Sequence, residues 1–291
     1  MLRWFWTVAV QRGWYIRTMK RLDTEAILPL TCTRDGVCCH GHVIWVNPWE
    51  VATLAAGTGL SVPEFRARYL DAHGTRLAFD GPPDRRGKPG CRLYHPERGC
   101  TAHAHRPLTC RMYPLGRSRL DGTVHYYYAG DTFPCIELCP TVTQLPTMTV
   151  GAYLAGQDIA PSEAAHDAYA RVIYGLAAVA RRIIDLGGAE VDRLRVGGFF
   201  DECQRLSPEA RSAILPEQWM ELATAPKGLD VADPAAFAEA HGAQITGAVQ
   251  RAASAIDGAL TEAVILYLAI AVHLAPTVGA DLTVMRQLVL D

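Results

Sequence analysis

Cysteines are the residues of this sequence that are best suited to chemistry. Eight of its nine cysteines lie in one stretch: Cys32, Cys38, Cys39, Cys91, Cys100, Cys110, Cys135 and Cys139. Thiolates gathered in this way form disulfides, hold a metal ion or cluster, or act as nucleophiles. The odd cysteine total and the directly adjacent pair Cys38–Cys39 argue against a plain disulfide scaffold.

The sequence predicts a reducing environment for these thiols. The apolar run at 4–10 is too short for the hydrophobic region of a signal peptide. The longest apolar run, at 263–274, is shorter than the ~20 residues of a membrane-spanning helix. We therefore expect a soluble cytoplasmic protein with no membrane span. Lasting disulfides are rare in the cytoplasm, so the clustered cysteines indicate metal ligands or catalytic thiols.

Cysteine spacing favours metal binding and leaves the metal open. Zinc takes four cysteine or histidine ligands, usually in closely spaced pairs, and the spacing here is not that of C-x2-C knuckles. Iron–sulfur clusters also take four cysteines, and nearby glycines would allow backbone N–H groups to approach the sulfurs. Eight cysteines could form two four-thiolate sites, or one site with spare thiols. A histidine could also complete a site of three cysteines; the candidates are His40, His42, His95, His103 and His105.

Several other residues near the cysteines could serve the same site. Arg106 and Arg111 could pair with the negative charge of a thiolate-ligated cluster or with a substrate carboxylate, although structural ion pairs explain them equally well. Tyr113 could line a pocket. Asp35 and Glu50 could be catalytic carboxylates, but a turn and a helix cap account for them adequately. The ninth cysteine lies in a helical context and reads as an inert core thiol: Cys203.

Composition excludes several classes of protein. The chain has 291 residues, of which 20% are charged and 49% are apolar, as in a globular protein. Its formal net charge of −2 gives no general attraction to nucleic acid. The sequence contains no phosphate-binding loop and no dinucleotide-binding glycine motif after a strand, which argues against a classical Rossmann methyltransferase.

The predicted organisation has three parts. Residues 1–30 form a short lead-in, residues 31–150 an irregular cysteine-rich metal-binding domain, and residues 151–291 a mainly helical domain. We therefore predict an α+β fold in which short strands and helices precede an α-helical C-terminal half.

Local signals place the expected elements. Capping-box patterns predict helices that begin at 48 and 62, the second running to about 72. Short strands are expected at 43–46 and 123–128. Between 91 and 114 prolines and glycines break any long element. A strong helix is expected from 161 to 187, and further helices from 208, from 234 and over 260–274.

The order of the cysteines resembles that of a known family. C-x5-C-C-x-G at 32–41 is followed by C-x8-C-x9-C-R-x-Y-P at 91–114, with Arg106-Pro107 before Cys110. This pattern resembles the CxxCxxCC cysteine-cluster family over residues 30–140. That family is described as zinc- or iron-chelating, and it includes the flagellin lysine N-methylases.

The resemblance implies a metal centre and, for one branch of the family, a reaction. It implies an iron–sulfur centre of the 4Fe–4S type, and for the methylases S-adenosylmethionine as methyl donor. His103 and His105 occupy a segment where relatives have an Ile-Tyr type pair, and the region beyond 150 gives no match to the methylase branch. The metal centre therefore carries over better than the reaction does.

Our leading expectation is a cytoplasmic iron–sulfur protein that methylates a protein or peptide amine with S-adenosylmethionine. The eight clustered cysteines are its predicted metal ligands, and Arg106, Arg111 and Tyr113 its predicted cofactor contacts; no residue is assigned as catalytic. The alternative is a non-catalytic zinc- or iron-binding scaffold, a metal-handling protein or a redox-sensing module. A thiol-based redox enzyme is a third interpretation.

Overall fold

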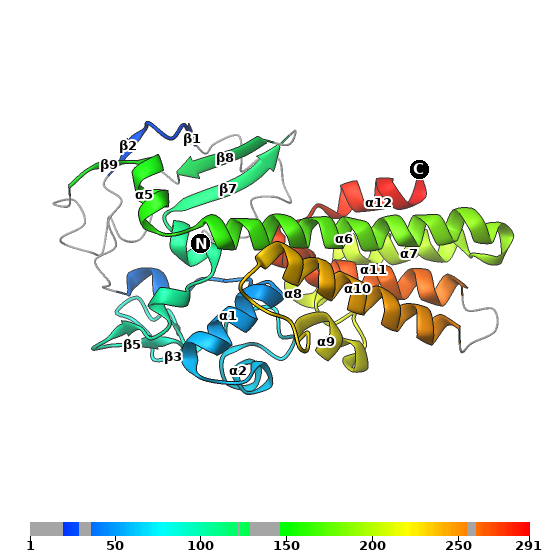
Figure 1. Cartoon of the computed structure of the whole chain (residues 1–291), viewed down its shortest axis with the longest axis horizontal. Helices are drawn as coiled ribbons and strands as arrows, with labels where there is room; N and C mark the ends of the chain where they lie inside the picture. Colours follow the sequence, from blue (N-terminus) through cyan, green and yellow to red (C-terminus); the bar gives the residue numbers. More distant parts are fainter. Residues whose placement is uncertain (1–19, 29–35, 121–122, 129–145, 255–259) are drawn as a thin grey trace.

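The computed structural model describes residues 20–28, 36–120, 123–128, 146–254 and 260–291. Short strands and helices make up the described part of the first half, and long helices make up the second half (Figure 1). The predicted α+β class is therefore confirmed. Most of the predicted lead-in and three of the predicted ligands, Cys32, Cys135 and Cys139, lie outside the described residues.

Two helices, α1 (Pro48–Thr58) and α2 (Val62–Tyr69), begin where the sequence predicts them. A capping box starts each one: the cap side chain accepts the third residue's N–H, and that residue's carboxylate accepts the cap's N–H. The pairs that form these boxes are Asn47 with Glu50 and Ser61 with Glu64. Gly59, at φ +71°, ends α1 in the left-handed conformation that glycine adopts without strain.

Two local predictions were wrong in their details. The second helix ends at Tyr69 rather than near 72, because Leu70 is extended and pairs with Leu77 in an isolated bridge. The apolar stretch 43–46 does not form a strand of its own. It makes one antiparallel bridge, between Trp45 and Arg76.

The longest strands form one antiparallel sheet. Its order is β1 (Lys20–Leu22), β8 (Thr123–Tyr128) and β7 (Leu115–Leu120), so the predicted strand at 123–128 is confirmed, and it pairs with the strand that precedes it in the chain. A second pairing joins β2 (Ile27–Leu28) to β9 (Met148–Thr149). Residues 20–28 thus pair with strands that come after Cys110 in the sequence.

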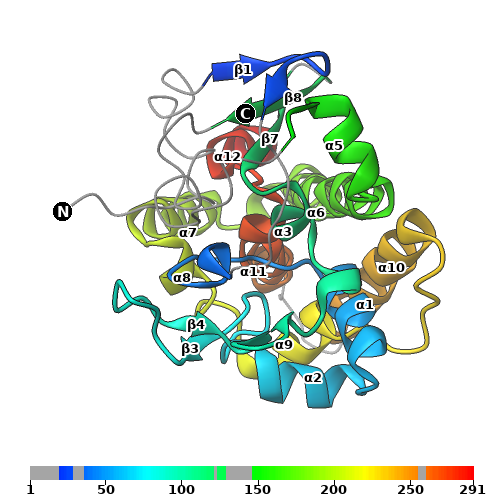
Figure 2. The same cartoon turned by 90° about the vertical axis from the view of Figure 1, so that its left-hand side faces the viewer.

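Short elements carry the cysteines. Between residues 91 and 112 the longest element is a five-residue helix, α3 (Leu108–Met112), as the prolines and glycines predict. From one end of the molecule α3 lies between the three-stranded sheet and α1–α2 (Figure 2). The other short elements are η1 (Val37–Cys39), β3 (Phe79–Gly81), β4 (Gly90–Cys91), β5 (Tyr94–His95), β6 (Gly99–Cys100) and η2 (His103–His105).

The C-terminal half is a helical bundle around α6 (Ala160–Gly187), which packs against α10 (Pro234–Ala253) and α11 (Leu260–Val278). The predicted helix starts near residues 161, 208, 234 and 260 are confirmed. The remaining elements are α5 (Val150–Gly156), η5 (Gly188–Glu190), α7 (Arg193–Arg205), α8 (Pro208–Arg211), α9 (Glu217–Thr224) and α12 (Leu282–Leu290).

Helix α11 is long and apolar enough to cross a membrane, because it extends beyond the run at 263–274. It is the one such helix among the described residues, and 78% of its most apolar window is buried inside the protein. Burial on nearly all sides is also typical of the central helix of a large core.

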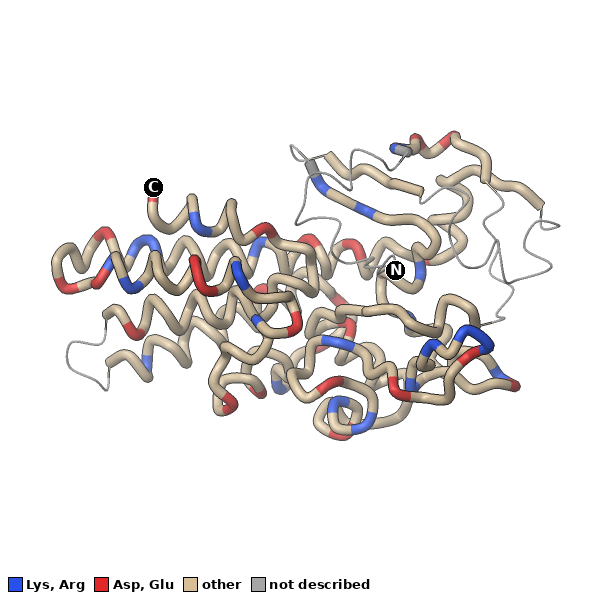
Figure 3. Tube along the Cα trace, turned by 180° about the vertical axis from the view of Figure 1, so that it is seen from behind, with Lys and Arg blue, Asp and Glu red and all other residues tan. Residues whose placement is uncertain are grey.

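Several contacts join the halves of the molecule, and two of them involve Trp49 and Arg117. Trp49 of α1 packs in the core of the helical bundle, and its indole N–H donates to the carbonyl oxygen of Val231 at 3.0 Å. Arg117 of β7, whose side chain is 4% exposed, pairs with Glu163 and Asp167 of α6. Elsewhere basic and acidic residues are mixed along the described trace (Figure 3).

Candidate metal centre

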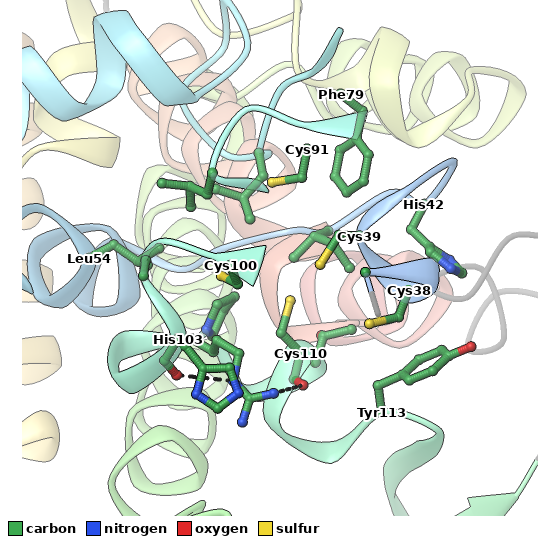
Figure 4. A pocket seen from close by; sticks show the side chains of 18 of the residues that line it. Cys38, Cys39, His42, Leu54, Phe79, Cys91, Cys100, His103, Cys110 and Tyr113 are labelled. Carbon is green, nitrogen blue, oxygen red and sulfur yellow. Dashed lines mark hydrogen bonds between the residues drawn. The ribbon is translucent and has the colours of Figure 1, made fainter. Parts of the chain in front are cut away.

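Five cysteines line one pocket in the first half of the molecule: Cys38, Cys39, Cys91, Cys100 and Cys110. Their sulfur atoms lie around a common space (Figure 4). The cavity that they border has a volume of about 70 Å³ and is partly open to solvent. The structure thus brings together every cysteine of the predicted ligand set that lies in the described residues.

Four separate segments deliver these thiols. Cys38 and Cys39 lie on η1, and the other three lie on β4, β6 and α3. Gly36 stands before η1 at φ +76°, where a Cβ would lie 2.2 Å from the ring of Tyr94. Only glycine fits this position, so the close approach of the Cys38–Cys39 turn to the β5–β6 hairpin depends on it. Arg86 braces the same turn by donating to the carbonyl oxygen of Val37 at 3.1 Å.

The rest of the pocket wall is mostly apolar. The aliphatic and aromatic side chains that line it are Ile44, Leu54, Leu77, Phe79, Leu93 and Leu115. Burial raises the pKa of Cys91 to about 12, with a further contribution from the neighbouring Cys100. Burial also raises the pKa of Cys110 well above its ordinary value, and Cys100, Cys91 and Cys38 add to this.

These thiols fit a positively charged ligand. Several thiolates close together in an apolar wall repel one another and lose solvation, so they ionise only when a cation offsets their charge. Zinc and iron both bind thiolate sulfur and supply that charge. Within the described ranges, no three cysteine, histidine or acidic side chains are close enough to hold one metal ion. The five thiols are spread around the pocket.

Cys203 is the remaining described cysteine. It is fully buried in α7 within the core of the helical bundle, away from the pocket. Burial raises the pKa of its thiol to about 11. Its position agrees with the predicted inert core thiol.

Arg106 lies in the pocket wall and holds the backbone around Cys110. Its Nε donates to the carbonyl oxygen of His103 at 3.1 Å, and one Nη donates to that of Cys110 at 3.3 Å. Its other Nη donates to the side chain of Gln157 at 2.8 Å. The guanidinium therefore links the backbone at His103 and at Cys110 to Gln157, the residue that follows α5.

Arg111 makes a matching set of contacts outside the pocket wall. It donates to the carbonyl oxygens of Arg106, Ala104 and Gln157 at 2.7, 2.6 and 2.8 Å. Among the described residues neither arginine forms the ion pair that was the alternative interpretation; both bind carbonyl oxygens. Contact of Arg106, Arg111 or Tyr113 with a cofactor remains a prediction, supported for Arg106 and Tyr113 by their place in the pocket wall.

Among the five candidate histidines, His42 and His103 line the pocket. His42 is buried, and its ring meets the edge of the Tyr113 ring at a centroid distance of 5.7 Å. Burial, and then the nearby charge of Arg86, lowers the pKa of His42 to about 4, so its imidazole is neutral. His40 instead donates from Nδ1 to the carbonyl oxygen of Gly36 at 2.8 Å and stabilises the turn.

Glu50 has a contact that sequence reasoning missed. Its cap role is confirmed, but its second carboxylate oxygen also accepts the N–H of Leu108 at 2.7 Å. Leu108 begins α3, the helix that carries Cys110. The carboxylate thus fixes α3 against α1. No local pattern could indicate this bond, because 58 positions separate the two residues.

Residues 31–128 match the model of a family named CxxCxxCC, which is described as "Putative zinc- or iron-chelating domain". The predicted resemblance is therefore confirmed over this stretch, which contains all five pocket cysteines. No curated protein and no solved structure matches the chain. This part of the chain is therefore similar to a cysteine-cluster domain described as zinc- or iron-chelating.

The family name also exposes a departure in this chain. Aligned on Cys38–Cys39, the pattern C-x-x-C-x-x-C-C places its first cysteine at Cys32 and its second at position 35. This chain has Asp35 there, so one cysteine of the named pattern is replaced by a carboxylate.

Proposed function

We propose that the cysteine pocket binds a 4Fe–4S cluster, and that the protein uses this cluster in methyl transfer from S-adenosylmethionine to a protein or peptide amine. The observation that carries the proposal is the pocket itself, in which five thiols from four segments surround one space. The methyl-transfer part rests on the resemblance to the flagellin lysine N-methylases.

The shape of the pocket favours a cluster over a single zinc ion. A zinc ion draws four ligands to within about 2.3 Å of one point. The five sulfurs here instead border a wider space with aliphatic walls. A cluster has several metal atoms and so accepts thiolates that arrive from separated directions. The nearby Arg106 guanidinium offsets part of the negative charge that thiolate ligands bring to a buried centre.

The proposed reaction assigns separate tasks to the protein. An iron atom that lacks one protein ligand would supply the binding position for the methyl donor. The substrate amine, held as the free base, attacks the sulfonium methyl carbon. The carbon–sulfur bond breaks, S-adenosylhomocysteine leaves, and the nitrogen loses a proton to solvent. The protein's residues hold the two partners in line and exclude water from the pocket.

Metal analysis of anaerobically purified protein tests the cluster. We expect a brown protein with broad visible absorption, and iron matched by acid-labile sulfide. A colourless protein with stoichiometric zinc and no sulfide would overturn the cluster proposal. It would favour a zinc-stabilised scaffold, and the methyl-transfer proposal would fall with the cluster.

Binding of S-adenosylmethionine tests the reaction class separately. Calorimetry should detect binding to cluster-loaded protein and none to protein from which the cluster has been removed. A scaffold or a metal-handling module has no reason to bind this molecule. Absence of binding to fully loaded protein would therefore reject methyl transfer and leave the metal centre in place.

A further inference from the structure

His42 is a buried side chain whose Nε2 atom has no hydrogen-bond partner in the part of the chain that the structure describes. The residue is 9% exposed and lines the cysteine pocket. Buried polar atoms are almost always hydrogen-bonded, because a buried nitrogen without a partner has lost its water without gaining a bond in return. An orphaned nitrogen in the wall of a ligand pocket therefore indicates a contact with the ligand.

His40 shows that this segment can satisfy a buried imidazole. It lies two positions earlier, is 7% exposed, and bonds through Nδ1 to the carbonyl oxygen of Gly36. The centroids of the His40 and Tyr94 rings are 4.8 Å apart, and Tyr94 belongs to the β5–β6 hairpin. His42 has ring contact with Tyr113 but no such hydrogen bond for Nε2. One ring nitrogen of His40 is thus hydrogen-bonded within this segment, whereas the buried Nε2 of His42 has no partner among the described residues.

The surroundings of His42 place it beside a thiol. His42, Cys38 and Tyr113 lie at one end of the pocket, opposite Cys100 and His103 (Figure 4). A neutral imidazole carries a lone pair on one ring nitrogen, and this is the form that binds zinc or iron. Arg86 lies near enough to act electrostatically on His42, but its donors go to Asp84 and to the carbonyl oxygen of Val37.

We infer that His42 coordinates the metal centre through Nε2, so that the centre has mixed thiolate and imidazole ligation. This inference rests on the proposed metal centre and adds a residue to it. Imidazole is a neutral ligand, so replacing one thiolate with it makes the centre less negative. Coordination of the metal also gives the buried Nε2 atom of His42 a partner.

Pulsed electron paramagnetic resonance of the reduced cluster tests the inference directly. Protein grown with nitrogen-15 histidine, compared with unlabelled protein, should show the hyperfine coupling of a directly bound imidazole nitrogen. His42→Asn should lose this coupling. The matched control His40→Asn removes a buried histidine from the same segment and should keep it. Absence of the coupling from wild-type protein, or its persistence in His42→Asn, would overturn the inference.

Two further arms keep the test decisive. If His42→Asn does not load, His42→Cys offers a thiolate at the same position and should load without the nitrogen coupling; coupling that persists there would refute the inference. If the purified protein holds zinc, the cluster proposal fails but ligation by His42 is still testable. After cobalt substitution, the visible ligand-field bands of the His42→Ala variant should then differ from those of wild type. The bands of the His40→Ala variant should be the same as those of wild type. Unchanged bands on His42→Ala would reject the inference alone.

Discussion

Glu50 shows how much a single buried side chain can contribute to the site. Its carboxylate is 4% exposed and joins the start of α1 to the start of α3 through two backbone N–H groups. Burial raises the pKa of Glu50 to about 7, although the bonds from Leu108 and Asn47 and the charge of Arg111 oppose the rise. The group is therefore half protonated near neutral pH.

The raised pKa of Glu50 predicts a pH-dependent stability. Between about pH 4.5 and pH 7 the folded protein holds a proton that the unfolded chain releases, so stability falls as pH rises through this window. From pH 5 to pH 7.5 the free energy of unfolding should fall by about 2 kcal/mol more in wild type than in Glu50→Gln, which cannot ionise. Urea denaturation at the two pH values measures the difference, and equal pH dependence would contradict the assignment.

Individual residues also set the limits of prediction from sequence. Capping residues are read correctly because a cap bonds to N–H groups two or three positions away. The Glu50–Leu108 bond and the orphaned Nε2 of His42 depend on the tertiary fold, so no local pattern indicates them. Residue types near the cysteines gave five candidate histidines, and only the structure separates His42 from His40.

The helices α1 and α2 form a natural matched pair. Both begin with the same capping box, but only the glutamate of α1 reaches α3. Glu50→Ala should remove a cap and also release the helix that carries Cys110, whereas Glu64→Ala should remove a cap alone. We expect Glu50→Ala to lower bound metal per protein at least two-fold and Glu64→Ala to leave it unchanged. Equal metal content in the two variants would show that the α1–α3 link does not support the site.

The contact between β7 and α6 offers a second pair. Arg117 and Arg119 both bind Asp167, but their side chains are 4% and 49% exposed. Arg117→Met removes the guanidinium that pairs with Glu163 and leaves Asp167 without its better-buried partner, so it should destabilise the protein by about 3 kcal/mol. Arg119→Met should change stability by less than about 1 kcal/mol, because water screens the exposed pair. Chemical denaturation that gave equal losses would contradict this account of the contact.

Elements made by local signals were predicted well, and elements made by distant pairing were not. Helix starts follow from caps and prolines, and β8 from its aromatic and β-branched run. By contrast, β1 pairs with β8 across about a hundred residues, and β2 pairs with β9 in the same way. Register over such separations is set by packing of the whole chain, which the sequence pattern does not encode locally.

On the scale of the whole molecule, the cysteine pocket is supported by the helical half. Trp49 of α1 packs in the bundle core, and Gln157 after α5 receives hydrogen bonds from Arg106 and Arg111. These contacts cross the predicted boundary at 150, which remains a prediction as a division into domains. These contacts hold the pocket against the helical half of the molecule. Packing against that half therefore positions the pocket's thiols, in addition to the loops that carry them.

The ligand set combines what the sequence could and could not provide. Cysteine spacing and the family pattern identified eight candidate thiolates and separated Cys203 from them. Which candidates share one site depends on four segments meeting in space, and the structure brings five of them to one pocket. Cytoplasmic location and the choice of a protein or peptide substrate remain proposals.

Metal content of two cysteine variants tests the central claim most directly. Cys110 lies in the pocket and Cys203 lies buried in the bundle core, so each alanine substitution removes one buried thiol. Iron, sulfide and zinc are measured per protein after anaerobic purification. The account predicts that Cys110→Ala loses most of the bound metal while Cys203→Ala keeps it. Full metal content in Cys110→Ala, or an equal loss in both variants, would contradict a metal centre in this pocket.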